Sequence, residues 1–185
     1  MHLFHTGYQI IEKPDVHYGR KNADFGQGFY LSDNEEFSKR WARIRKGTTT
    51  YLNRYELDLK DLQVTYLSRN DQWFKYIYNN RSHREDYLKE FDVIIGPIAN
   101  DTIYDTFGIL TAGVLTDDQA LEALLIGPEY HQIVLKTEKA AENLHFKDAL
   151  VLSHDEISSY RSLVEKEEAE YQELFSKKIS QLLED

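Results

Sequence analysis

Residues 24–32 of this 185-residue chain read Asp-Phe-Gly-Gln-Gly-Phe-Tyr-Leu-Ser. The phenylalanine, tyrosine and leucine that follow the second glycine are residue types that favour strands. We therefore expect a short strand over residues 28–32, entered from a polar loop over residues 13–27. The two glycines lack a Cβ atom, so the backbone here can approach a neighbouring group or a bound molecule closely.

Short strands and helices alternate on both sides of this stretch. A helix capped by Ser32 or Asp33 is expected to run to about Lys46, with Phe37, Trp41 and Ile44 on one face. The other expected strands cover residues 2–11, 48–59, 64–67, 91–98, 131–136 and 149–152. The other expected helices cover residues 71–80 (apolar face Trp73, Phe74, Ile77 and Tyr78), 101–112, 116–125 and 138–144, and Thr116 with Gln119 forms a capping box.

The pattern of residues 153–183 predicts one long acidic helix. Ser153 and Glu156 form a second capping box, and the pattern continues to about Leu183. Residues 154–185 hold nine acidic and four basic side chains. This helix could fold back on the domain or pair with another chain, but about 30 helical residues reach roughly 45 Å, which favours protrusion and a contact with a protein partner or a second copy. The apolar stripe behind this expectation is Ile157, Tyr160, Val164, Tyr171, Phe175, Ile179 and Leu182.

Composition excludes several classes of protein. The net charge of −10 argues against broad binding to nucleic acid, which needs clustered lysine and arginine. The chain has no cysteine and no pair of histidines at metal-ligand spacing, so we expect no disulfide and no metal site. No signal peptide and no membrane-spanning run is recognisable. We expect a cytoplasmic protein, and leave a secreted effector open.

Three short motifs carry the functional hypothesis. Residues 3–7 read Leu-Phe-His-Thr-Gly, and residues 130–135 read Tyr-His-Gln-Ile-Val-Leu; residues 24–32 lie between them. In this order they resemble the ADP-ribosyltransferase superfamily, specifically its poly(ADP-ribose) polymerase-like branch. The chain departs from that pattern where Thr6 replaces glycine, Gln27 replaces lysine and Gln132 replaces glutamate.

The resemblance tightens to a bacterial family of unknown function with this fold, domain of unknown function 3990. The matching blocks are residues 13–15 (Lys-Pro-Asp), 19–20 (Gly-Arg), 24–31, 92–99 (Asp-Val-Ile-Ile-Gly-Pro-Ile-Ala) and 132–133 (Gln-Ile). It implies an α+β fold with split antiparallel sheets and flanking helices. We therefore predict an ADP-ribosyltransferase-like domain over residues 1–152 and an acidic C-terminal helix over residues 153–185.

The resemblance implies NAD⁺ as substrate and assigns roles to the motif residues. His5, Tyr30 and Gln132 are the expected catalytic residues. His5 would hydrogen-bond a ribose hydroxyl, the Tyr30 ring would stack on nicotinamide, and Arg20 would pair with the pyrophosphate. The expected binding residues are His5, Thr6, Gly7, Arg20, Gly28, Phe29, Tyr30 and Ser32. Three side chains should converge in one cleft: His5, Tyr30 and Gln132.

Gln132 leaves alternatives open, because an amide orients a hydroxyl but carries no charge. The first hypothesis is a mono-ADP-ribosyltransferase with an unknown acceptor. The alternatives are a weakly active or inactive module that binds NAD⁺ or ADP-ribose, and an interaction protein that acts through its C-terminal helix. Glu129 is an alternative carboxylate, although an offset of three residues puts it on the other face of the strand.

Two charged clusters also have alternative interpretations. Asp92, Asp101 and Asp105 are candidate Mg²⁺ ligands, but helix capping explains their positions better. The basic run is either a solvated helix face or a phosphate-binding surface. Its members are Arg40, Arg43, Arg45 and Lys46.

Overall fold

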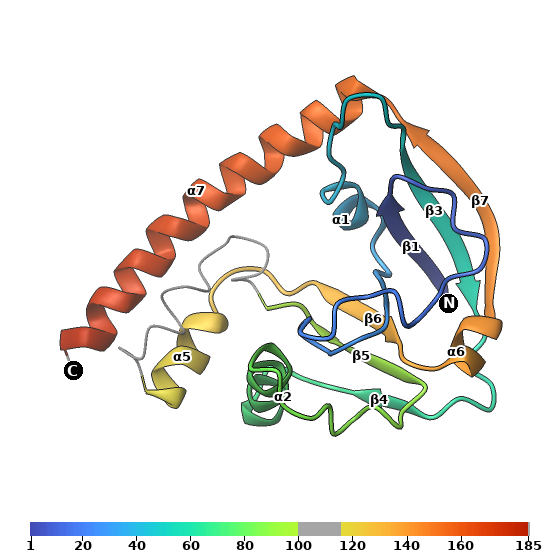
Figure 1. The fold of residues 1–185 in the computed structure, drawn as a ribbon. Helices are drawn as coiled ribbons and strands as arrows, with labels where there is room; N and C mark the ends of the chain where they lie inside the picture. The colour runs from blue at the N-terminus through green and yellow to red at the C-terminus, as the bar shows by residue number, and fades with distance from the viewer. Residues whose placement is uncertain (100–115, 185) are drawn as a thin grey trace.

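The computed structural model describes residues 1–99 and 116–184, which form two small β-sheets, several short helices and one long one (Figure 1). The first sheet is antiparallel, in the order β1-β3-β7. The second has the order β2-β6-β5-β4. The strands are β1 (His2–Gly7), β2 (Phe29–Leu31), β3 (Thr50–Leu57), β4 (Val64–Tyr66), β5 (Val93–Pro97), β6 (His131–Leu135) and β7 (Leu144–Leu152).

The expected pair of split sheets is confirmed, but not their wholly antiparallel pairing. Strand β4 runs parallel to β5, and the other pairs are antiparallel. The chain between β4 and β5 contains helix α2 (Asp71–Arg81), and a crossover of this kind is what a parallel pair requires. The second sheet is therefore mixed, with its one parallel pair at the edge.

Among residues 1–99 and 116–184, one isolated backbone bridge links the two sheets. Phe4 of β1 and Ser32, just after β2, exchange both of their N–H···O bonds, at 2.9 and 3.0 Å. This bridge places the middle of β1 beside the end of β2, so two of the three sequence motifs, residues 3–7 and 24–32, meet here.

The core explains why the central strands have few polar residues. All five residues of β5 are buried, because β5 lies between β4 and β6 and α2 packs against the second sheet. Trp73 and Tyr76 of α2 are fully buried, and the indole Nε1 of Trp73 donates to the Pro97 carbonyl at 2.8 Å. The buried face of α2 includes Tyr76 in place of the expected Tyr78, which is 46% exposed.

Helix α1 (Glu35–Lys39) is much shorter than expected. Its N-cap is Asn34, whose side chain accepts from the Phe37 amide, so neither Ser32 nor Asp33 caps it. After α1, Arg43 donates to the carbonyls of Arg40 and Ala42, and the chain turns toward β3. The expected apolar face therefore does not form: Trp41 and Ile44 are exposed.

The other helices follow the sequence expectations closely. Helix α5 (Asp117–Leu124) begins with the Thr116–Gln119 capping box, and α6 (Glu138–Glu142) is capped by Thr137. Strand β7 begins five residues earlier than expected, at Leu144. The helix expected over residues 101–112 lies outside the described residues.

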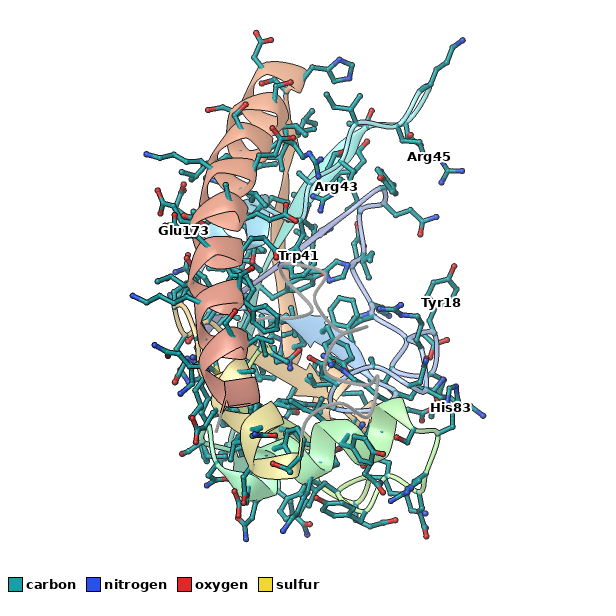
Figure 2. All side chains as sticks on the ribbon, turned by 90° about the vertical axis from the view of Figure 1, so that its left-hand side faces the viewer. Tyr18, Trp41, Arg43, Arg45, His83 and Glu173 are labelled. Carbon is teal, nitrogen blue, oxygen red and sulfur yellow. The ribbon has the colours of Figure 1, made fainter. Side chains whose placement is uncertain are left out.

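Helix α7 (His154–Glu184) is the long helix that the sequence predicts, but it packs back on the domain and does not protrude (Figure 1). Ile157 is buried with Leu52 and Leu152 of the first sheet. Further along, Tyr171 and Phe175 are buried against Ala123 of α5. Figure 2 shows the polar Glu173 on the outer face of this helix. Much of the apolar stripe is therefore covered within the same chain.

Candidate functional site

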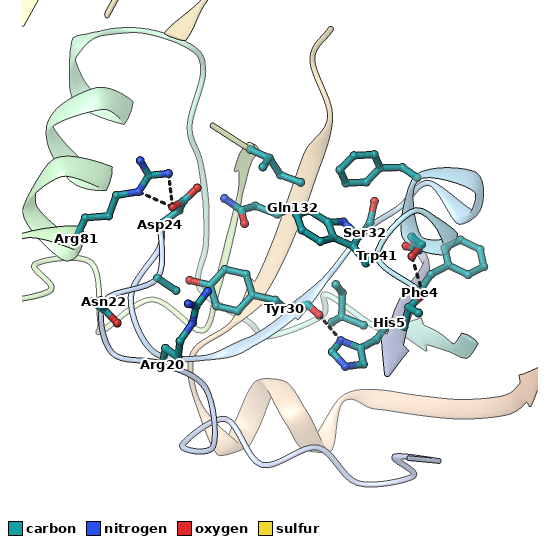
Figure 3. A pocket seen from close by; sticks show the side chains of 16 residues that line it. Phe4, His5, Arg20, Asn22, Asp24, Tyr30, Ser32, Trp41, Arg81 and Gln132 are labelled. Atoms are coloured by element: carbon teal, nitrogen blue, oxygen red, sulfur yellow. Dashed lines mark hydrogen bonds and ion pairs between the residues drawn. The ribbon is translucent and has the colours of Figure 1, made fainter. Parts of the chain in front are cut away.

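A cleft of about 670 Å³ lies where the three motifs meet (Figure 3). Small-molecule sites commonly enclose roughly 300–1,000 Å³. The cleft is lined by Phe4, His5, Thr6, Arg20, Asn22, Ala23, Asp24, Tyr30, Leu31, Ser32, Phe37, Ser38, Trp41, Arg81, Ile98 and Gln132. The predicted convergence of His5, Tyr30 and Gln132 is therefore confirmed.

His5 is held in one tautomer by the neighbouring strand. Its Nδ1 lies 2.8 Å from the Tyr30 carbonyl oxygen, and this oxygen can only accept, so Nδ1 carries the proton (Figure 3). Burial lowers the pKa of His5, while the bond to the Tyr30 carbonyl opposes that shift. The ring is therefore neutral near pH 7, and Nε2 keeps a lone pair that can accept a hydrogen bond. The Phe29 ring packs on the imidazole, with centroids 4.7 Å apart.

Tyr30 presents its ring to the cleft and anchors its hydroxyl to the loop that precedes β2. The hydroxyl donates to the Gly26 carbonyl at 2.6 Å and accepts from the Phe25 amide at 3.0 Å. Burial, with Asp24 nearby, raises the pKa of Tyr30 far above its usual value, so the hydroxyl stays protonated. The hydroxyl is occupied by the protein, which leaves the ring face as the part of Tyr30 available to a ligand.

Gln132 is the most unusual polar residue of the site. It lies opposite Gly96 in the β5–β6 pair and is 6% exposed. Its Nε2 is buried, and no partner for it exists among residues 1–99 and 116–184. Buried polar atoms in native proteins are nearly always hydrogen-bonded, and each exception needs an explanation. A donor without a partner on the wall of a cleft is explained if a bound molecule supplies the acceptor.

Two more expected residues line the cleft with their hydroxyls already bonded. Thr6 Oγ1 donates to the Ser38 carbonyl at 2.6 Å. Ser32 Oγ accepts from the Asn34 amide at 3.1 Å and lies 3.3 Å from the His131 carbonyl. Both side chains tie β1 and β2 to neighbouring segments, so their first role in the structure is to shape the cleft.

Gly7, Gly28 and Phe29 do not line the cleft. A Cβ atom at Gly28 would lie 2.6 Å from both the Leu135 carbonyl oxygen and Val134 Cγ1, so this glycine permits close pairing of β2 with β6. At Gly26, where φ is +71°, a Cβ would lie 2.3 Å from the Asp86 carboxylate. The two glycines of the motif therefore allow the protein to pack closely against itself, and the neighbouring groups that the backbone approaches are Leu135 and Val134 at Gly28 and Asp86 at Gly26.

The charged end of the cleft consists of Arg20, Asp24 and Arg81. Arg81 binds the Asp24 carboxylate through Nε at 2.8 Å and through NH2 at 2.7 Å. Asp24 is the one carboxylate among the lining residues that the structure describes, and the ion pair with Arg81 neutralises it. Arg20 is exposed at the rim, which leaves its guanidinium accessible to an anion.

Sequence reasoning missed Ser38 and Trp41, which line the opposite wall of the cleft. Ser38 is buried, and its Oγ has no hydrogen-bond partner within the described part of the chain. Trp41 is 38% exposed and meets the Phe37 ring edge-on, with centroids 5.9 Å apart. In the sequence, the signal for this wall is a tryptophan four residues after Phe37. The same spacing also fits the core-facing stripe that the sequence predicts.

The other charged candidates have structural roles. Glu129 pairs with Arg69 and His131 outside the cleft, so it does not replace the missing carboxylate. Asp92 is buried, which opposes its ionisation, but hydrogen bonds from Thr137 and the Gln63 amide, with Lys139 nearby, hold its pKa below the usual value.

Metal binding by the aspartates finds no support in the described residues, which contain no cluster of three candidate ligands. Asp101 and Asp105 lie outside those residues. Two members of the basic run make contacts within the protein. Arg40 is bound to Glu167, and the Arg45 guanidinium lies over the Tyr8 ring, 5.9 Å from its centroid.

Comparison with known families places the chain. Residues 1–146 match a family described as "Protein of unknown function (DUF3990)". The chain belongs to the DUF3990 family. The match ends within β7, so α7 lies beyond the part of the chain that the DUF3990 description covers. No curated protein matches the sequence. In the described ranges, no helix has the length and apolar character needed to cross a membrane.

Proposed function

We propose that this DUF3990 protein binds NAD⁺ in the cleft and is a mono-ADP-ribosyltransferase. The observation that carries the proposal is the buried Gln132 Nε2, which lacks an acceptor and lines the same cleft as the neutral His5 and the Tyr30 ring. A donor, an acceptor and an aromatic face in one cavity match what a nucleoside offers: hydroxyls that accept and donate, and a flat ring.

Each part of NAD⁺ has a candidate partner among the lining residues. Tyr30 and Trp41 supply aromatic faces for the nicotinamide ring. His5 Nε2 accepts a hydrogen bond from a ribose hydroxyl, and Gln132 Nε2 donates one. Arg20 faces the pyrophosphate, where a planar guanidinium can bind two oxygens at once.

The reaction breaks the bond between C1′ of the ribose and the nicotinamide nitrogen, and the bonding electrons leave with the ring, which becomes neutral. The ring therefore needs no proton donor, and positive charge develops on the ribose. An acceptor then forms the new bond to C1′ and releases its proton to the solvent. Gln132 and His5 contribute by holding the ribose in the reactive orientation, because neither bears a negative charge.

The absence of a free carboxylate among the described lining residues limits the chemistry. Asp24 is neutralised by Arg81, and Gln132 cannot deprotonate an incoming ribose hydroxyl. We therefore expect a single transfer and no chain elongation. The same observation favours a second candidate, a module that binds NAD⁺ or ADP-ribose without turnover.

Turnover separates the two candidates. NAD⁺ affinity and free nicotinamide are measured for the full chain and for Gln132→Glu. A transferase releases nicotinamide, and Gln132→Glu releases it faster, because a carboxylate in a dry cleft stabilises the cationic ribose better than an amide. Tight NAD⁺ binding with no release by either protein would leave only the binding module. Absence of NAD⁺ binding would remove both.

A further inference from the structure

One wall of the cleft, which we call the α1 wall, consists of Phe37, Ser38 and Trp41. Its position depends on contacts from outside α1. Helix α1 has only five residues, and isolated helices of this length are not stable in water. It nevertheless carries Phe37 and Ser38, and Trp41 follows directly, so three lining residues of the cleft move with it. Whatever fixes α1 therefore fixes this side of the cleft.

Arg40, at the C-terminal end of α1, contacts two other elements at once. Its NH1 group donates to the hydroxyl of Tyr130 at 3.0 Å and to the carboxylate of Glu167. The guanidinium also lies over the Tyr130 ring, 5.2 Å from its centroid. Because Tyr130 directly precedes β6 and Glu167 belongs to α7, Arg40 connects α1 to both.

An aromatic row continues this connection to the cleft. The Tyr130 ring stacks on Phe37, with centroids 4.1 Å apart and planes 16° apart, and Phe37 meets Trp41 edge-on. Two turns earlier along α7, the Tyr160 hydroxyl lies 2.5 Å from Glu36. Residues of α7 therefore contact α1 on one side, and Tyr130, at the start of β6, contacts it on the other.

We propose that Glu167 and Tyr130, acting through Arg40, are positioning residues that fix α1 against β6. They thereby set the position of Ser38 and Trp41 relative to Gln132. The ligand whose binding depends on this position is NAD⁺, and this part of the inference rests on the proposed function. Since α7 lies beyond the DUF3990 match, this chain supports one wall of its cleft with a segment that the family description does not include.

Trp41 fluorescence tests the positioning role without any ligand. The chain has two tryptophans, and Trp73 is fully buried, so acrylamide quenching of the full chain reports mainly on Trp41. We expect Glu167→Ala to steepen the quenching and shift the emission to longer wavelength. Glu167→Gln keeps an acceptor oxygen for Arg40 and should restore part of the wild-type signal. The matched control is Glu170→Ala, which removes an exposed carboxylate from the same helix.

Ligand binding provides a second, separate measurement. We expect Glu167→Ala to weaken NAD⁺ binding about three- to tenfold relative to Glu170→Ala, the effect of losing one well-oriented contact. Identical quenching in Glu167→Ala and Glu170→Ala, at a temperature where both are folded, would overturn the inference. If Glu167→Ala does not fold, Tyr130→Phe replaces it and is judged in the same way. Failure of the wild type to bind NAD⁺, with Trp41 still released by Glu167→Ala, would overturn the proposed function and support the positioning role.

Discussion

The wall of the cleft that carries Tyr30 is held by buried groups, whereas the α1 wall is held by contacts nearer the surface. Behind Tyr30, Lys136 donates to the Phe25 carbonyl and binds Asp86 at 2.7 Å, and the Lys136 side chain is 3% exposed. Behind α1, the Arg40–Glu167 pair is 16% and 27% exposed.

The difference indicates which wall can adjust. Tyr76 also donates to Asp86, at 2.7 Å, and Asn80 donates to the Asp24 carbonyl, so the loop that anchors Tyr30 is bonded from several sides. Burial lowers the pKa of Lys136 and the bond to Asp86 opposes this shift, which shows how closely the charge depends on its partner. We infer that the Tyr30 wall is rigid and that α1 is the wall that changes position when its contacts are altered.

The largest effect is expected from Lys136→Met, which removes the buried cation and leaves the half-buried Asp86 carboxylate without it. Removing one partner of a buried ion pair costs about 3–5 kcal/mol of unfolding free energy. Urea unfolding measures this loss. Arg54→Met is the matched control, since the Arg54–Asp148 pair lies in the open, and it should cost far less. Equal losses for the two variants would contradict the rigid-wall interpretation.

A smaller effect is expected at Tyr30, where two substitutions separate ring from hydroxyl. Tyr30→Phe loses the bonds to Phe25 and Gly26, at about 0.5–1.5 kcal/mol of stability each, and keeps the ring. Tyr30→Ala also loses the aromatic contact to NAD⁺, worth roughly 0.5–1.5 kcal/mol beyond the buried area. Titration with NAD⁺ should therefore show a larger loss for alanine than for phenylalanine. Equal losses would assign the contribution to the hydroxyl, and no loss in either would make Tyr30 a core residue only.

One unpartnered polar atom on each wall allows a direct comparison between Gln132→Ala and Ser38→Ala. Each removes one neutral hydrogen bond to the ligand, worth about 0.5–1.5 kcal/mol, or roughly three- to tenfold in NAD⁺ affinity or turnover. Neither breaks a hydrogen bond within the described part of the protein. Ser32→Ala serves as the contrast, because Ser32 Oγ bonds within the protein and its loss should reduce stability first. A drop in stability without a change in NAD⁺ affinity for both variants would argue against a ligand contact.

The smallest effect concerns the charge of His5. The pKa of His5 in the folded state lies below the ordinary value of about 6.5. As the pH falls below about 6.5, His5 therefore binds a proton in the unfolded chain before it does so in the folded chain. The neutral ring's contribution is therefore complete above about pH 6.5 and is lost as the pH falls toward the folded-state pKa. Unfolding free energies of wild type and His5→Gln, compared between pH 7.5 and about pH 5, should differ in slope by at most about 1.4 kcal/mol per pH unit. Identical slopes would show that His5 titrates freely.

Sequence periodicity located the central strands because β3, β5 and β6 carry mostly buried residues. It overextended α1, since Trp41 and Ile44 match a helical stripe although the chain has already turned toward β3. It also misplaced the start of β7, where only Leu144 is buried among residues 144–148 and the regular pairing with β3 shifts between Arg54 and Tyr55. These errors arise from tertiary contacts that no local pattern contains.

The strand part of the site could be predicted, and the α1 part could not. His5, Tyr30 and Gln132 lie in motifs whose order the resemblance made recognisable, and the Phe4–Ser32 bridge brings two of them together. Ser38 and Trp41 reach the cleft only because α1 ends early and is held by Arg40. The protrusion expected of α7 is wrong for the same reason: its apolar stripe finds Leu52 and Ala123 within the chain.

Release of nicotinamide from NAD⁺ by the full chain tests the central claim most directly. We expect release by the wild type, less by Tyr30→Ala, and more by Gln132→Glu, each measured at NAD⁺ concentrations below saturation, where the rate of release depends on both binding and chemistry. Release that is equal in the wild type and Tyr30→Ala would contradict the assignment of the chemistry to this cleft.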